Sequence, residues 1–117
     1  MDPLLKERIQ KLNIVHIKHH IFLCSDQTKP KCCSHAEGLI AWDFLKARLE
    51  ELNLTEHVGI FRTKANCLRI CRQGPIMVIY PEGVWYHSCN KINIERILQE
   101  HIIRGNIVTD CLLIEKN

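Results

Sequence analysis

Cysteine is the residue type in this chain that is best suited to chemistry. The sequence of 117 residues contains seven cysteines, and five of them lie in two short stretches, CSDQTKPKCC and CLRIC. Eight residues separate Cys24 from Cys33, and three separate Cys67 from Cys71. An odd number of cysteines cannot pair completely as disulfides. In a reducing compartment, such a chain points to metal binding or redox chemistry.

The apolar pattern predicts the elements that position these cysteines. Four strands are expected at KHHIFLC, HVGIFRTK, IMVIY and VWYHS, and helices are expected over 37–52 and from an N-cap at Asn90 to Gly105. A helix between the first two strands implies that they are parallel. The tight turn PEG between the last two strands implies that they are antiparallel. We therefore predict an α/β protein with a mixed four-stranded sheet and helices against its faces, which is a thioredoxin-like fold.

Two further segments lie outside this layout. Asp2 and Pro3 look like the cap and first residue of a short amphipathic helix, so residues 1–17 are interpreted as an N-terminal helical extension and residues 18–117 as the domain. The C-terminal stretch NIVTDCLLIEKN is predicted to be a tail that contains a short strand.

The predicted elements bring the cysteines to one edge of the sheet. Cys24 ends the first strand, and loops that follow neighbouring parallel strands share an edge. Four thiols are therefore expected to meet there: Cys24, either Cys32 or Cys33, Cys67 and Cys71. Four cysteines suit tetrahedral zinc or an iron–sulfur cluster. The wide spacing of the first pair favours a two-iron cluster over a compact zinc knuckle.

The motifs that surround these cysteines resemble one known family. A cysteine at a strand end, CC in the next loop, CLRIC and then GPIMVIYPEGVWY are similar to the thioredoxin-like 2Fe–2S ferredoxins, over about residues 20–107. These are small bacterial electron carriers related to the small iron–sulfur subunit of respiratory complex I. The resemblance implies a one-electron carrier rather than an enzyme, with a 2Fe–2S cluster on four cysteines, redox proteins as partners and a homodimeric assembly.

The resemblance also bears on the choice between Cys32 and Cys33. Neighbouring side chains of an extended loop point to opposite sides, so one of the two is expected to bind iron. The glycine that follows the second ligand in the family has its nearest counterpart in Gly38, which favours Cys33. We therefore predict that Cys24, Cys33, Cys67 and Cys71 hold the cluster. Cys89 and Cys111 are expected to be small buried apolar residues.

Three other kinds of site could use these residues. A thiol–disulfide oxidoreductase on the same fold would normally have two residues between its cysteines, in the loop after the first strand. A structural zinc site needs the same four thiolates. A Rieske-type centre would use His19 and His20 in place of two cysteines, but both precede the strand end.

Composition limits the remaining functions. A net charge of +3 and 6% aromatic residues do not indicate a nucleic-acid partner. No apolar run reaches the roughly 18 residues of a membrane span, and the N-terminus does not resemble a signal peptide. The protein is therefore expected in the cytoplasm. Lys29, Lys31, Lys64, Arg69 and Arg72 flank the cysteines and would favour added negative charge there.

Overall fold

The computed structural model describes residues 1–25, 33–70 and 72–115. Five strands form one mixed sheet in the order β2-β1-β3-β4-β5, and their bounds are β1 His19–Cys24, β2 Ile60–Ala65, β3 Met77–Tyr80, β4 Val84–Tyr86 and β5 Leu112–Ile114. Strand β1 is parallel to β2 and antiparallel to β3, and β3 is antiparallel to β4. The predicted fold class and the directions of these strands are confirmed.

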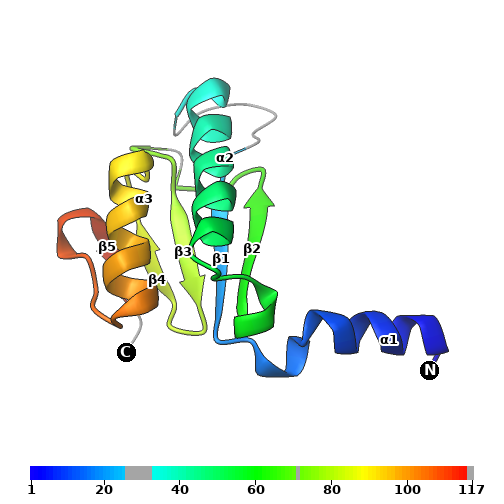
Figure 1. Cartoon of the computed structure of the whole chain (residues 1–117). Helices are drawn as coiled ribbons and strands as arrows, with labels where there is room; N and C mark the ends of the chain where they lie inside the picture. The colour runs from blue at the N-terminus through cyan, green and yellow to red at the C-terminus, as the bar shows by residue number, and fades with distance from the viewer. Residues whose placement is uncertain (26–32, 71, 116–117) are drawn as a thin grey trace.

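Two helices cover one face of the sheet (Figure 1). Helix α2, His35–Glu51, connects β1 to β2. Helix α3, Lys91–Ile97, begins at Asn90, whose side chain accepts a hydrogen bond from the Asn93 amide. It continues as a π-helical segment, Leu98–Ile103. The predicted helices lie against the sheet, where α2 and α3 pack side by side on the same face.

The core lies between this face and the two helices. Strand β3 is the middle strand, and its Met77, Val78 and Ile79 are all buried. The register places Ile21 opposite Ile79 and Leu23 opposite Met77, so these side chains point to the helices together. Leu45 and Leu49 of α2 and Ile94 and Ile97 of α3 complete this core. The uninterrupted apolar run IMVIY is therefore explained by a central position in the sheet.

Two details differ from the expected elements. Residues Glu56–Val58 form a 3₁₀ turn that ends at Gly59, so β2 starts at Ile60. Gly59 has φ +85°, and a Cβ there would approach the His16 carbonyl oxygen to 2.5 Å. The second difference is that the short strand expected in the C-terminal tail joins the sheet beside β4, which makes the sheet five-stranded.

Helix α1, Pro3–Leu12, projects away from the body (Figure 1). The Asp2 carboxylate accepts a hydrogen bond from the Leu5 amide, as expected for an N-cap, and Asn13 ends the helix in the left-handed region. None of its residues is buried. In the described part of the chain, no helix is long and apolar enough to cross a bilayer.

Candidate metal centre

The ends of β1 and β2 place two of the predicted ligands at one edge of the sheet. Cys24 is the last residue of β1 and pairs with Ala65, the last residue of β2. The ladder continues by one bond, from the Ser25 amide to the Ala65 carbonyl, at 3.0 Å. Cys67 follows Ala65 by two residues, so the parallel pairing brings Cys24 and Cys67 to the same edge.

The start of helix α2 brings Cys33 to this edge. Cys33 precedes Ser34, the N-cap, which forms a capping box with Glu37 through bonds of 3.0 and 3.2 Å. Gly38, in the first turn, lies against Ser25, and a Cβ on Gly38 would meet the Ser25 carbonyl oxygen at 2.7 Å. The missing side chain therefore lets the helix approach the residue that follows Cys24.

Two backbone amides donate hydrogen bonds to cysteine sulfurs. The Ile76 amide donates to Cys24 Sγ at 3.0 Å, and the Arg69 amide donates to Cys67 Sγ at 3.2 Å. Such bonds stabilise negative charge on sulfur, and in iron–sulfur proteins they also adjust the reduction potential. The surroundings of both sulfurs therefore fit thiolate ligands of an iron–sulfur cluster.

Backbone hydrogen bonds fix the loop before β3, which contains the Ile76 amide. Its Ile76 carbonyl accepts from the Cys24 amide at 3.0 Å, and its Pro75 carbonyl accepts from the Cys89 amide at 2.9 Å. The Gln73 carbonyl accepts from the Ser88 amide at 2.7 Å. These bonds fix the Ile76 amide in position beside Cys24.

Left-handed backbone is concentrated around these bonds. Arg69, Gln73 and Ser88 have φ of 71°, 52° and 52°. The left-handed region costs a residue other than glycine about 1 kcal/mol or more, and such strain gathers at functional sites. Three such residues in the segments that carry or support the cysteines therefore indicate a backbone shaped for the site.

The predicted ligands differ in exposure, and the structure describes three of the four. Cys24 is 1% exposed, Cys33 is intermediate and Cys67 is exposed. Cys71, together with Cys32, Lys29 and Lys31, lies outside the described residues. Among residues 1–25, 33–70 and 72–115, no three His, Cys, Asp or Glu side chains already lie together as a metal site. The structure therefore brings three of the proposed ligand positions to one edge and leaves the complete set as a prediction.

Cys89 and Cys111 are buried, as expected, with exposures of 0% and 2%. Burial is the largest cause that raises the pKa of both thiols. Both side chains belong to the core. They are therefore neutral thiols at physiological pH.

The two histidines considered for a Rieske-type centre start β1 and lie far from Cys24. His20 Nε2 is 2.8 Å from Thr63 Oγ1, and His19 Nδ1 is 2.8 Å from the Glu82 carboxylate. Cys24 lies five positions beyond His19 along the extended strand, which is roughly 16 Å. The Rieske-type alternative is therefore excluded for His19 and His20.

The same carboxylate belongs to a partly buried polar network. Glu82 also contacts His101 Nε2 at 2.7 Å, and His101 Nδ1 contacts the Tyr86 hydroxyl at 2.7 Å. Burial, which raises the pKa of Tyr86 to about 12, keeps the phenol protonated. Burial alone would raise the pKa of Glu82, but hydrogen bonds from His101 and from its own backbone, with the charge of His19, lower it. This network joins β4 to the last helix at the other end of the molecule.

Comparisons with known proteins identify relatives of this chain. No family model matches the chain. A 2Fe–2S ferredoxin of Clostridium pasteurianum is 36% identical over 100 residues, which cover 81% of this chain and 95% of the relative. A 2Fe–2S ferredoxin of Aquifex aeolicus is 26% identical over 103 residues, which cover 83% and 89%.

A solved structure has the same fold. The thioredoxin-like [2Fe-2S] ferredoxin from Aquifex aeolicus superimposes with a TM-score of 0.74 at 21% identity, covering 86% of this chain and 94% of that one. The fold and the sulfur-rich edge thus define a thioredoxin-like iron–sulfur protein. With the sequence identity to the clostridial protein, the chain belongs to the 2Fe–2S ferredoxins of thioredoxin-like fold.

Sequence reasoning did not find the amides of Ile76 and Arg69 as parts of the site. A backbone amide has no residue signature, because every residue except proline carries one. Gly38 did carry a signal, since an isolated glycine in a helical pattern often has a packing reason.

Proposed function

We propose that this protein is a one-electron carrier whose 2Fe–2S cluster is held by Cys24, Cys33, Cys67 and Cys71. The assignment of a 2Fe–2S cluster and of electron transfer follows from membership of the ferredoxin family. The assignment of ligands is supported by the amides of Ile76 and Arg69, which donate to the sulfurs of Cys24 and Cys67.

A 2Fe–2S cluster, when bound, accepts one electron and releases it again. The chain provides four sulfurs and backbone donors that stabilise their negative charge. The site differs in its access to water between the side at Cys24 and the side at Cys67. Cys24 is almost completely buried, whereas Cys67 is exposed. The side of the site at Cys67 is therefore the side from which a redox partner can approach.

Positive charge near the ligands favours the reduced form. Lys64, Arg69 and Arg72 are exposed and lie within five residues of Cys67. A cluster on four cysteinates is already anionic, and reduction adds one negative charge. Nearby cations stabilise that added charge, so they raise the potential within the roughly −700 to +450 mV that iron–sulfur clusters span.

Neither alternative explains the surroundings of the cysteines as well. A dithiol enzyme would need Cys67 to form a disulfide with a nearby cysteine, while the three-residue gap to Cys71 is not the usual redox spacing. A zinc site would accept the same donors, but the relatives of this chain are 2Fe–2S ferredoxins. We therefore assign it electron transfer without substrate chemistry of its own.

The proposed partners are redox proteins, with neither nucleic acid nor a membrane involved. The modest net charge of +3 and the low aromatic content offer no extended surface for nucleic acid. The core thiols of Cys89 and Cys111 suit a reducing compartment. We place the protein in the cytoplasm.

We also propose that the protein is a homodimer. Helix α1 and the residues after it expose apolar side chains that a second chain would cover: Leu4, Leu5, Leu12, Ile14 and Val15. Tyr80, the last residue of β3, is also 42% exposed, and its ring lies 6.5 Å from that of Phe22. Light scattering should give the mass of two chains, and the mass of one chain would refute the dimer.

A reductive titration tests the proposed function directly. Anaerobically purified protein should be reddish brown, and its visible absorbance should bleach with about one electron per chain. A colourless protein, as expected of a zinc site or a dithiol enzyme, would contradict the proposal.

A further inference from the structure

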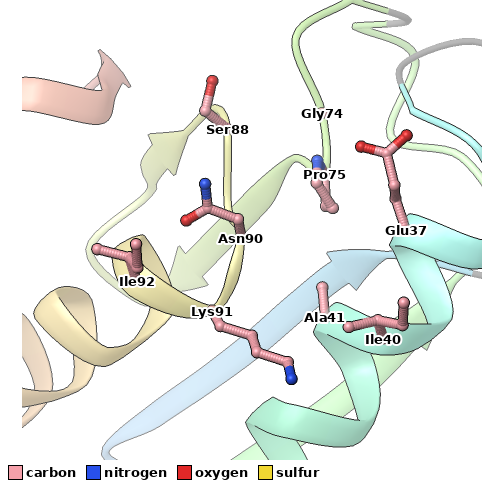
Figure 2. A pocket seen from close by; sticks show the side chains of 9 residues that line it. All are labelled: Glu37, Ile40, Ala41, Gly74, Pro75, Ser88, Asn90, Lys91 and Ile92. Carbon is pink, nitrogen blue, oxygen red and sulfur yellow. The ribbon is translucent and has the colours of Figure 1, made fainter.

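An open pocket of about 590 Å³ lies between α2, the loop before β3 and the start of α3 (Figure 2). Three segments form its walls: the start of α2, the loop before β3 and the start of α3 with the residues preceding it. Its lining consists of Glu37, Ile40, Ala41, Gly74, Pro75, Ser88, Asn90, Lys91 and Ile92.

Two walls of this pocket also carry or support proposed ligands. Pro75 immediately precedes Ile76, whose amide donates to Cys24 Sγ. Glu37, at another wall, is bonded to Ser34, the residue after Cys33. A molecule seated in the pocket would therefore contact the segments that hold the proposed cluster.

Exposed apolar side chains surround the opening. Ile40 of α2 is 53% exposed and Ile92 of α3 is 73% exposed, although both line the pocket. Apolar side chains gathered at a concave site are typical of a binding surface rather than of scattered surface residues.

Lys91 lines the pocket, and Arg69 and Arg72 precede the lining residue Gly74 by five and two positions in the sequence. Arg69, Arg72 and Lys91 are exposed, and no ion pair involves them within the described residues. By contrast, Arg48 and Arg96 pair with Glu95 and Asp110. The carboxylate of Glu37 is already bonded to the Ser34 amide. Within the described residues, the loop before β3 and the start of α3 therefore present positive charge that no printed ion pair neutralises, next to an apolar pocket.

We propose that this pocket and its basic rim are the docking surface for an acidic electron-transfer protein, one of whose apolar side chains enters the pocket. The inference rests on the proposed function, because it assigns the partner of the same cluster. Arg69, Arg72 and Lys91 attract carboxylates of the partner, while Ile40 and Ile92 contact its apolar side chain. Charge attraction accelerates encounter, and apolar contact in the pocket slows dissociation.

The test uses the complete protein with its cluster and a defined acidic probe. Oxidised flavodoxin, an acidic protein whose flavin accepts one electron, is mixed with the reduced protein in a stopped-flow instrument. Benzoquinone, an uncharged oxidant, is measured in parallel for each variant. The ratio of the flavodoxin rate to the benzoquinone rate reports docking apart from the state of the cluster.

Two surface variants have matched controls. Ile92→Asp changes the pocket rim, and Ile103→Asp makes the same change at an exposed isoleucine at the other end of that helical segment. Lys91→Glu reverses a charge beside the pocket, and Lys11→Glu reverses one in the projecting α1. Ile92→Asp and Lys91→Glu should each lower the rate ratio by roughly three- to tenfold. The control variants should stay within about twofold of the unaltered protein.

Salt provides a second readout. Between 0.1 and 1 M ionic strength the screening length falls from about 10 to about 3 Å, so the flavodoxin rate should fall and the effect of Lys91→Glu should nearly disappear. Equal ratios for pocket and control variants, or a rate independent of salt, would overturn the docking surface. A change in oligomeric mass caused by Ile92→Asp would overturn it too, because the pocket would then contact a second copy. Protein without visible absorbance would refute the proposed function itself.

Discussion

Cys24 and Cys67 differ in their surroundings, although each sulfur accepts a hydrogen bond from a backbone amide. Cys24 is buried between β2 and the loop before β3, whereas Cys67 lies at the surface. Desolvation makes a charged sulfur costly unless donors compensate. The Ile76 amide at 3.0 Å supplies this compensation where water cannot.

Replacing Cys33 tests the second ligand, for which the sequence offers both Cys32 and Cys33. Cys33→Ser should change or abolish the visible spectrum, because a harder oxygen replaces sulfur on iron. Cys32→Ser, its neighbour and control, should leave the spectrum nearly intact. The measurement is the visible spectrum of each anaerobically purified variant. The reverse pattern would move the assignment to Cys32, and two normal spectra would mean that the thiols can replace one another.

Gly38→Ala tests the close approach of α2 to the strand end. The added Cβ would lie 2.7 Å from the Ser25 carbonyl oxygen and 2.9 Å from Ser25 Cα, so backbone must move. We expect a loss of about 1–3 kcal/mol in the free energy of unfolding, and a changed visible spectrum because Ser25 follows Cys24.

Gly105→Ala is the control for this change. Gly105 has φ +79° with nothing within 4 Å, so alanine there adds strain without a collision. Urea denaturation should show some destabilisation of Gly105→Ala, with an unaltered spectrum. A Gly38→Ala protein as stable as the parent, with an unchanged spectrum, would show that the approach has no role in the site.

Helices α2 and α3 are connected by an ion pair at their solvent side. Arg48 Nε donates to Glu95 Oε1 at 2.7 Å, and a second guanidinium nitrogen donates to Glu95 Oε2 at 2.9 Å. The Arg48 hydrogen bond is the main cause that lowers the pKa of Glu95 below its usual 4.5. The helix that follows Cys33 is thus fixed to the helix that starts beside the pocket.

The lowered pKa predicts how stability depends on pH. A carboxylate whose pKa is lower in the folded state stabilises the fold above its unfolded pKa, and this contribution disappears as pH falls through the folded pKa. Glu95→Gln should therefore lower the urea midpoint at pH 7, and the difference from the parent should shrink below pH 4.5. Glu7→Gln in the exposed α1 should have no effect at either pH. A difference for Glu95→Gln that stays constant down to pH 3 would contradict this role.

The order and direction of the elements could be predicted from the sequence, because connections restrict topology. A helix between β1 and β2 requires a parallel pair, and the tight turn before Val84 requires an antiparallel one. Participation of β5 in the sheet could not be predicted, since three residues with an irregular register leave little pattern. The helices share one face because the apolar residues of β1 and β3 alternate toward one side, which depends on register across strands distant in sequence.

The candidate site was predictable only in part. The positions and spacing of the cysteines identified the ligand candidates, because the sequence gives the type of every side chain directly. The donors at Ile76 and Arg69 depend on backbone direction in an irregular loop. The pocket depends on how the start of α2 meets that of α3, which the sequence does not specify locally.

The whole molecule separates into a body and the projecting α1. The clostridial relative is covered to 95% by an alignment that uses 81% of this chain, so this chain has residues beyond the shared region. Removing residues 1–17 should leave the visible spectrum of the remainder unchanged, because no residue of α1 is buried against the body of the chain.

Removing residues 106–117 serves as the control for this truncation. Val108 and Cys111 in that segment are core residues with exposures of 4% and 2%, so their loss should strongly destabilise the protein. If the protein without residues 1–17 lost its cluster, the boundary at residue 18 would be wrong.

The content of iron and inorganic sulfide tests the central claim most directly. Four thiolates that hold one 2Fe–2S cluster predict about two irons and two acid-labile sulfides per chain in anaerobically purified protein. The measurement combines metal analysis by mass spectrometry with chemical release of sulfide, on protein expressed in iron-replete cells. About one zinc per chain with no acid-labile sulfide would contradict the account.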